Sequence, residues 1–492
     1  MIKKISLALL SLFVVLGASL VFRAQTMPSL QPEGVAPVSI MVDEAAALQR
    51  FAGAIRIPTI SHEESENTDT TQFLALHAYF EETYPLVHEH LAREIVGGLS
   101  LLYTWQGTQR DLEPVVLMAH QDVVPVIPGT EEDWSHPPFA GVIADGFVWG
   151  RGTMDDKVGV VSILEAIEAL LAEGFQPRRT HYLAFGHDEE VGGARGASAI
   201  ADLLATREVE PYAYVIDEGG LVARGMVPGL DGAVALIGTA EKGYVNLELL
   251  VEGDGGHSST PPESTNIGIL AAAISRVEET PFPAHLEGPA LESFAYIGAE
   301  IGFLPRVVFA NLWLFGPLVK RLMLMDPSSA SSLRTTTAVT IVEGGVKANV
   351  LPIRARAVVN HRIRPGETIS SVLERVREVV DDDRVQVQVF GDWSADPSPV
   401  SDASGAPFQM LARTIMQVVP EDDVIVAPYV VPGGTDAKYY SGRSRHVFRF
   451  LPTPMESDAL QRIHGTNERM STEGFVTSIK FFQQLIRNSD GL

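Results

Sequence analysis

Short, continuously apolar runs recur in the first half of the chain, and each of them ends in polar residues. They lie at residues 115–119, 182–185 and 212–216. A run of this length without a polar interruption suits a strand that is covered on both faces. Between the first two runs, residues 158–173 repeat apolar side chains at helical spacing and end at Gly174. This alternation of strand and helix predicts an α/β protein with a mainly parallel central sheet.

Acids and histidines lie directly after these runs and in the turn before the helix. They are His120 and Asp122 after the first run, Asp155 and Asp156 in a glycine-flanked turn before the helix, Glu189 and Glu190 after the second run, and Asp217 and Glu218 after the third. Ligands in open α/β sheets bind at the carboxyl ends of the strands. Carboxylates gathered there repel one another unless cations neutralise them. Oxygen ligands with imidazole suit a two-zinc hydrolytic centre, and His464, after a further apolar run at residues 446–451, supplies a second imidazole.

Taken singly, these motifs have simpler explanations. His120 with Asp122 is also typical of a surface pair whose hydrogen bonds are satisfied, and Asp155-Asp156 is typical of a helix cap. Three consecutive acids directly after a buried strand, at residues 188–190, are harder to explain as a solvated face. The combination of motifs therefore favours the metal centre.

The composition narrows the chemistry further. The 492 residues include no cysteine, so disulfides, thiolate metal sites and a cysteine nucleophile are excluded, and His, Asp and Glu must hold any metal. Lys and Arg number 37 against 62 Asp and Glu, a formal net charge of −25. Because a field of this sign repels phosphate backbones, nucleic acid is not expected as a partner.

The N-terminal residues predict export. Lys3 and Lys4 precede an uncharged apolar run at residues 5–22, which as a helix reaches about 27 Å, enough to cross a thin bilayer. We assign residues 1–23 to a membrane anchor or signal peptide, and favour the uncleaved anchor because no clear small-residue cleavage site follows. Residues 24–41, which are rich in proline, predict an extended linker. The positive-inside rule then places the rest of the chain outside the cytoplasm, as a periplasmic or secreted domain.

Several longer motifs stand in a fixed order along the chain. They are His120-x-Asp122-Val123-Val124-Pro125, Gly150-Arg151-Gly152-Thr153-x-Asp155-x-Lys157, Glu189-Glu190-Val191-Gly192-Gly193, Pro432-Gly433-Gly434-Thr435-Asp436 and His464-Gly465-x-Asn467-Glu468. The set resembles the zinc aminoacylase and carboxypeptidase family, and in particular its branch of vacuolar carboxypeptidase S and secreted N-fatty-acyl-amino-acid synthase/hydrolases. The resemblance runs from about Asp43 to the C-terminus and implies a zinc-exopeptidase-like catalytic domain.

The resemblance implies two Zn²⁺ ions per chain and a role for each of these residues. Asp155 would bridge both ions, with His120 and Asp217 completing one site and Glu190 and His464 the other. Glu218 stays an alternative to Asp217, since sequence cannot separate neighbouring acids. Glu189 would be the general base that takes a proton from a metal-bound water and returns it to the leaving amine, and Asp122 would orient His120. A cis peptide bond between Asp155 and Asp156 is also implied.

The middle of the chain resembles an inserted α+β lid that often pairs two protomers in this family. The predicted division is residues 42–238 and 395–492 for the catalytic domain and residues 239–394 for the lid or dimerisation domain. The resemblance implies that His257 stabilises a developing oxyanion in the partner's site. It also implies that Asn349, Arg362 and Thr435 bind substrate. An arginine selects a free carboxylate through paired hydrogen bonds, although a surface salt bridge from Arg362 to Glu367 is the alternative.

One lid segment has no assigned use. Residues 307–319 are largely apolar and are bounded by Arg306 and by Lys320-Arg321. Thirteen residues are too short for a transmembrane span. A core helix or dimer surface is the simpler interpretation, and a wall for an acyl chain or a membrane-facing edge is the alternative.

The predicted function is that of an exported dizinc amidohydrolase that cleaves, and reversibly forms, the amide bond of N-acyl, chiefly N-fatty-acyl, amino acids. Cleavage of dipeptides or C-terminal residues, as by carboxypeptidase S, is the alternative, because both substrates place an amide beside a carboxylate. A metal-stabilised binding protein without catalysis is a third hypothesis. Such a protein would be expected to lose Glu189 or a ligand, and none is missing.

Overall fold

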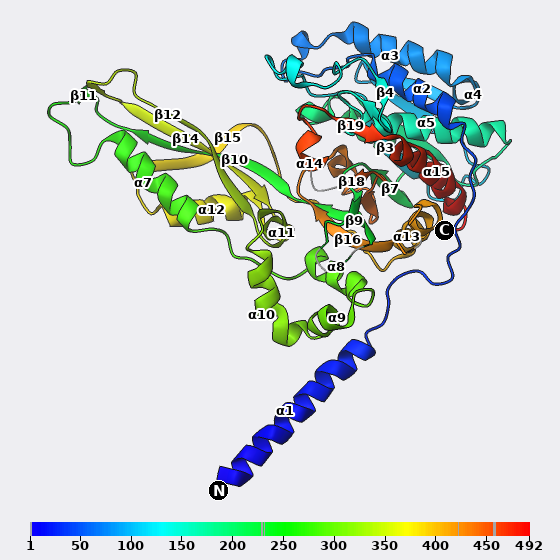
Figure 1. Ribbon diagram of the computed structural model, residues 1–492. Helices are drawn as coiled ribbons and strands as arrows, with labels where there is room; N and C mark the ends of the chain where they lie inside the picture. Colours follow the sequence, from blue (N-terminus) through cyan, green and yellow to red (C-terminus); the bar gives the residue numbers. More distant parts are fainter. Residues whose placement is uncertain (1, 228–229, 231, 422, 456–458) are drawn as a thin grey trace.

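The computed structural model describes residues 2–227, 230, 232–421, 423–455 and 459–492. Three parts make up the molecule: a body that corresponds to the predicted catalytic domain, a smaller part to one side that corresponds to the predicted lid, and a projecting N-terminal helix (Figure 1). The chain passes from the body into the lid between β9 (Ala233–Glu241) and β10 (Gly243–Glu252), and it returns after β15 (Val385–Ala395).

The body is built on a central sheet in the order β1-β2-β6-β3-β7-β17-β9-β8-β18, with β16 paired to β9. Its remaining strands are β1 (Ala92–Val96), β2 (Ser100–Trp105), β3 (Val115–His120), β6 (His181–Gly186), β7 (Tyr214–Asp217), β8 (Leu221–Arg224), β16 (Ile425–Val431), β17 (Val447–Arg449) and β18 (Pro454–Met455). The four neighbours β6, β3, β7 and β17 are parallel. These include the three predicted apolar runs, so the α/β class with a parallel centre is confirmed.

The flanks of this sheet are mixed rather than parallel. β1 pairs antiparallel with β2 and β2 antiparallel with β6. On the other side β9 is antiparallel to both β17 and β8. The parallel centre explains why the acidic strand ends meet at one edge, since β3, β6 and β7 all end there.

Helices cover both faces of the sheet. One face carries α2 (Glu44–Ile55), α5 (Lys157–Ala172), α13 (Ala406–Val418) and α15 (Thr472–Ser489), and the other carries α6 (Ala197–Thr206). Asp43 caps α2 by accepting a hydrogen bond from the Ala46 N–H. Helix α3 (Thr70–Thr83) packs against α2, and α4 (Pro85–His90) packs against α5. The predicted helix at residues 158–173 corresponds to α5, whose side chains are almost entirely buried.

A small second sheet joins the C-terminal part of the chain to the turn before α5. Its strands are β4 (Val142–Ala144), β5 (Phe147–Trp149) and β19 (Arg469–Ser471), in the order β19-β5-β4. The loop before β19 contains His464, and the turn after β5 contains Asp155. This pairing therefore brings two segments about 310 residues apart to one place.

The lid is a four-stranded antiparallel sheet in the order β12-β14-β10-β15. Strands β12 (Thr336–Gly344) and β14 (Arg354–Ile363) complete it, and α7 (Asn266–Glu279) and α12 (Ile369–Val380) cover one face with a core of their own. A two-stranded ribbon of β11 (Gly256–His257) and β13 (Val350–Leu351) forms its tip.

Four helices connect the lid core to the body: α8 (Pro289–Gly298), α9 (Phe303–Phe309), α10 (Leu312–Met323) and α11 (Pro327–Leu333). Although residues 239–394 are predicted as one lid, α8 packs against β16 of the catalytic body. The N-terminal helix α1 (Ile2–Gln25) ends beside α9. The linker is predicted at residues 24–41, whereas α1 continues to Gln25. The segment after α1 has no helix or strand before α2 and lies on the body, where Gln31 exchanges hydrogen bonds with the backbone of Val426.

Candidate metal centre

His120 is the last residue of β3, and its ring is fixed from both sides. Its Nδ1 lies 3.0 Å from the backbone oxygen of Asp122, and its Nε2 lies 2.8 Å from Asp155 Oδ1. The Asp122 carboxylate accepts hydrogen bonds from the Ser61 hydroxyl at 2.7 Å and from the backbone N–H groups of Glu189 and Glu190 at 3.2 and 3.1 Å. Asp122 thus holds the His120 loop and the glutamate pair in one arrangement.

Asp155 lies in the turn between β5 and α5. Its neighbour Asp156 caps α5 by accepting a hydrogen bond from the Gly159 N–H at 3.2 Å, so the capping role belongs to Asp156 and leaves Asp155 free to point at the histidines. The peptide bond between the two aspartates is cis, as the resemblance implies. Asp155 Oδ2 lies 3.0 Å from His464 Nε2.

A buried ion pair positions His464. Arg151 donates to the Glu468 carboxylate at 2.5 Å and to the backbone oxygens of His464 and Gly465 at 3.1 Å. The other Glu468 oxygen accepts from the Met154 N–H at 2.8 Å. These contacts hold His464 with φ at +61°, a left-handed conformation that non-glycine residues adopt infrequently.

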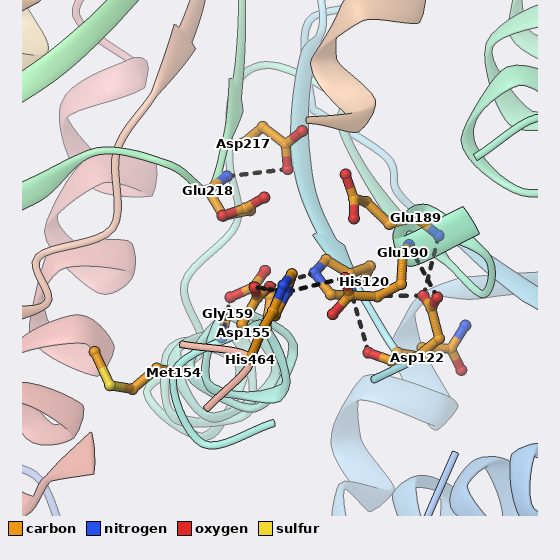
Figure 2. Close-up of polar contacts among 12 residues, drawn as sticks. His120, Asp122, Met154, Asp155, Gly159, Glu189, Glu190, Asp217, Glu218 and His464 are labelled. Carbon is orange, nitrogen blue, oxygen red and sulfur yellow. Dashed lines mark hydrogen bonds and ion pairs between the residues drawn. The ribbon is translucent and has the colours of Figure 1, made fainter. Parts of the chain in front are cut away.

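The ligand atoms form two groups that share Asp155. One group consists of His120, Asp155 and Glu218, and the other of Asp155, Glu190 and His464, each with its atoms within 4.8 Å of one another. The five residues come from five separate segments of the chain, and Figure 2 shows their side chains pointing toward one another. The sequence places these segments far apart, and the parallel strands together with the β5–β19 pairing bring them together.

The geometry corrects one predicted ligand. Asp217 points away from the group, with its carboxylate accepting hydrogen bonds from the backbone N–H groups of Glu218 at 3.0 Å and Ala437 at 2.7 Å (Figure 2). Adjacent residues at a strand end point to opposite sides, and here the side chain that faces His120 is Glu218. The alternative that sequence left open is therefore the one that the structure favours.

Burial makes this cluster electrostatically costly without cations. Removal from water raises the pKa of Glu190 to about 7, and Asp155 adds to the effect. The same cause raises the pKa values of Glu189 and Glu218 well above the ordinary range. Hydrogen bonds to Asp155 and Glu190 raise the pKa of His464 to about 10. Closely packed carboxylates with raised pKa values are the environment that bound cations stabilise.

The donor set fits two divalent ions of the zinc type. It offers two imidazoles and three carboxylates, the ligands that Zn²⁺ takes in hydrolytic sites. Glu190 Oε1 is buried and has no hydrogen-bond partner among the described residues, so one ligand oxygen has a place for a cation.

The structure separates the predicted substrate residues into two places. His257, in β11, and Asn349, just before β13, lie at the lid tip. There the Ser258 N–H donates to the backbone oxygen of Asn349. Figure 1 shows this tip far from the catalytic sheet, so within one chain His257 does not reach the ligand groups. Its ring instead lies 2.7 Å from the Ser259 hydroxyl.

Arg362 lies at the opposite end of the lid, near the connection to the body. Its guanidinium stacks 4.7 Å from the centre of the Tyr244 ring. The alternative partner Glu367 instead accepts from the Thr335 hydroxyl at 2.6 Å. Within the described part of the chain, Arg362 forms no ion pair, so its donors are free for a carboxylate. Burial lowers the pKa of Arg362 from its ordinary value.

Thr435 lies beneath the site rather than on its surface. Its side chain is buried, and its hydroxyl donates to Glu241, which also pairs with Arg449 at 2.7 Å. In this arrangement the Thr435 hydroxyl orders the Glu241 carboxylate. The predicted direct contact with substrate is therefore not supported by its position.

Arg151, Ser61 and Glu468 were not predicted to serve the site. Arg151 and Glu468 belong to the quoted motifs, and charged residues next to ligand positions were the signal that could have found them. Ser61 precedes β3 by more than fifty residues and carries no local signal.

Two ligand groups sharing one aspartate, with Glu189 beside them, define a metal-dependent hydrolase. The sequence model of the peptidase family M20/M25/M40 matches residues 116–488, so the chain belongs to this family. It is therefore a metal-dependent enzyme that acts on peptide or amide bonds.

Related proteins extend over nearly the whole chain. The N-fatty-acyl-amino acid synthase/hydrolase PM20D1 of Xenopus tropicalis is 40% identical over 97% of this chain and 93% of its own length. Carboxypeptidase S of Saccharomyces cerevisiae is 35% identical over 90% of this chain and 84% of its own length. The M20 metallo-carboxypeptidase Sso-CP2 of Sulfolobus solfataricus shares the fold, with a TM-score of 0.64 at 19% identity over 92% of this chain and 100% of that one.

Proposed function

We propose that this protein is an exported, two-zinc amidohydrolase that cleaves N-acyl amino acids, with fatty acyl groups as the favoured class. The observation that carries the proposal is the pair of ligand groups around Asp155, with Glu189 beside them. The similarity over almost the full chain to an N-fatty-acyl-amino acid synthase/hydrolase supports the substrate class.

In this proposal each metal ion has its own set of ligands. His120 and Glu218 would hold one ion, Glu190 and His464 would hold the other, and Asp155 would bridge them. When bound, two such ions lower the pKa of a water molecule and polarise the scissile carbonyl.

Glu189 is the proposed proton carrier. Its side chain comes from the short η3 turn (Glu189–Val191) and lies beside the ligands (Figure 2). It would accept a proton from the attacking water as the new C–O bond forms. It would then donate that proton to the amine nitrogen as the C–N bond breaks. The products are a carboxylic acid and a free amine, and the reverse sequence makes the amide.

The position of Glu189 depends on Asp122. Because Asp122 accepts the N–H groups of both Glu189 and Glu190, the two side chains start from a fixed backbone. This explains how neighbouring glutamates can have different roles: Glu190 meets His464 at 3.1 Å, and Glu189 is left for proton transfer.

Arg362 would recognise the amino-acid carboxylate. Its guanidinium lacks an acidic partner among the described residues, and the Tyr244 ring holds it in place. A guanidinium that offers a planar fork of donors binds a carboxylate through two hydrogen bonds. Such a contact would explain selection of a substrate with a free carboxylate next to the amide.

The lid tip would act on a second copy of the chain. His257 and Asn349 are exposed and lie away from their own metal centre. We propose that two protomers pair through their lids, so that His257 of one chain stabilises the developing oxyanion in the other.

Export would follow from α1. Residues Lys4–Gln25 form a helix with a mean hydropathy of 2.6 that is long and apolar enough to cross a bilayer. A cleaved signal sequence can have the same length and hydropathy. That α1 stays attached as a membrane anchor is therefore part of the proposal. Lys3 and Lys4 would remain on the cytoplasmic side.

Cleavage of dipeptides is the second candidate, because the relative from yeast is a carboxypeptidase. Zinc-loaded enzyme assayed against matched panels decides between them: N-oleoyl and N-acetyl derivatives of one set of amino acids, and dipeptides ending in the same set. We expect the highest kcat/KM for the N-oleoyl series. A higher value for the dipeptides would reject the proposed substrate class.

A further inference from the structure

The helix pair α9–α10 carries an exposed apolar face that the proposed catalysis does not use. Along α10 and just beyond it, Leu314, Leu318, Leu322 and Met325 follow one another at helical spacing. Leu318, Leu322 and Met325 are 52%, 57% and 77% exposed, and Val319 is the one buried side chain of this helix. A soluble surface seldom presents leucines in such a row without a partner.

The apolar face lies beside the helix that is long enough to cross a membrane. Helix α1 packs against α9, and the Asn311 side-chain amide donates to the Leu20 oxygen of α1 at 3.1 Å. Met27, just after α1, packs against Gly298 of α8. Figure 1 shows α9 and α10 at the end of α1 from which the chain enters the body.

The depth of this contact matches that of an interfacial helix. Leu20 lies five residues before Gln25, the last residue of α1, which is about 8 Å along the helix axis. Amphipathic helices at a bilayer surface bury their apolar faces about 5–10 Å deep. If α1 spans the bilayer, the α9–α10 pair therefore lies within the outer interfacial layer.

The body cannot swing freely away from this position. Gln31, six residues beyond α1, donates to the backbone oxygens of Tyr296 and Val426 and accepts from the Val426 N–H. Val38 donates its N–H to Gln417. The segment after α1 is thus bound along the body instead of acting as a free tether.

The local charge also favours a lipid surface. The chain as a whole carries −25, but residues 303–325 contain Arg306, Lys320 and Arg321 and no acidic residue. Trp313, which is 61% exposed, adds an amphipathic ring of the kind that gathers at membrane interfaces. Basic residues next to an apolar face attract anionic headgroups.

We infer that α9–α10 is a second membrane contact, a monotopic surface that lies in the outer leaflet beside α1 and fixes the catalytic body against the bilayer. This inference rests on the proposed membrane anchor. It commits to a lipid bilayer as the occupant, and a second copy of the chain is an outcome that would overturn it.

Spin labels on single cysteines test the inference, because the chain has no cysteine of its own. Leu318→Cys and Leu322→Cys report on the face. Leu74→Cys on α3, which is 51% exposed, is the matched control, and Val14→Cys reports on α1. The full chain, with its mass verified, is reconstituted into vesicles of phosphatidylcholine and phosphatidylglycerol. Collision rates are then measured with oxygen, which enters lipid, and with a polar nickel chelate, which stays in water.

We expect the ratio of oxygen to nickel collisions at 318 and 322 to be several-fold higher than at 74, and high at 14. If 14 lies in lipid while 318 and 322 resemble 74, the anchor stands and the second contact is rejected. If the labels at residues 318 and 322 are protected from both reagents and show dipolar broadening between labels, this face contacts a second copy of the chain. That result would also reject the second membrane contact. A water-exposed label at 14 would reject both proposals. Equal thermal unfolding of the variants verifies their folds.

Discussion

Glu468 and Arg151 form a buried ion pair that connects the two ends of the metal centre. Arg151 binds the backbone oxygen of His464, and Glu468 binds the N–H of Met154, one residue before Asp155. The pair therefore fixes the distance between the shared ligand and the last ligand of the chain, although about 310 residues separate them in sequence.

Removing one partner of this pair should lower the stability of the folded protein strongly. We expect Glu468→Ala to lower the free energy of unfolding by about 3–5 kcal/mol, because Arg151 is left buried and unpaired. Glu473→Ala, which removes an exposed partner of Arg224, is the control and should cost less than about 1 kcal/mol. Denaturant unfolding measures both. Similar values for the two variants would refute the positioning role.

Glu218 and Asp217 should differ in metal content. We expect Glu218→Ala to retain about one zinc per chain, because only one ligand group loses a member. Asp217→Asn should retain about two, since an amide oxygen still accepts a backbone N–H. Metal analysis after dialysis decides between them, and the reverse pattern would restore Asp217 as the ligand.

His257 should act in trans if the lids pair. Glu189→Gln and His257→Ala are each expected to be inactive alone. Co-expressed in one cell, they should form mixed dimers in which one site keeps both Glu189 and a partner's His257. Activity well above that of either variant is the expected result. Absence of any recovery, with mixed dimers verified by differential tags, would refute the trans contribution.

Stability should fall at mildly acidic pH because of His181. Burial lowers its pKa to about 4, and its Nε2 has no hydrogen-bond partner among the described residues. Between pH 6.5 and pH 4, His181 binds a proton in the unfolded chain but stays neutral in the folded chain. The free energy of unfolding therefore falls as pH falls. The loss for this residue is about 3 kcal/mol at pH 4. His181→Asn should show a correspondingly shallower decline, and an unchanged decline would argue against it.

The sequence predicts the periodic elements well because their burial pattern is local. Helix α5 (Lys157–Ala172) lies within one residue of the predicted range 158–173 at each end, and most of its side chains are buried. The antiparallel flanks of the central sheet were not predicted. Strands β1 and β8 are partly exposed and lack the continuous apolar runs that identify the parallel centre.

In the candidate site, too, the features that depend on local sequence could be predicted and those that depend on tertiary contacts could not. Strand-end acids are visible in sequence because they follow buried runs, and the structure brings His120, Asp155, Glu190 and His464 together. Which of two adjacent acids faces the cluster depends on the orientation of one strand end, and this is not encoded in spacing. The buried contact of Thr435 with Glu241 is likewise a tertiary property, linking residues 194 positions apart.

The central claim is that Glu189 moves the proton at a centre held by other residues. Zinc content and turnover of Glu189→Gln, measured on the same preparation with an N-acyl amino acid, test it most directly. We expect two zinc ions per chain to remain and kcat to fall by about 10²–10⁴, the usual contribution of general acid–base catalysis. Retention of both metals with more than about a tenth of the wild-type kcat would contradict the account.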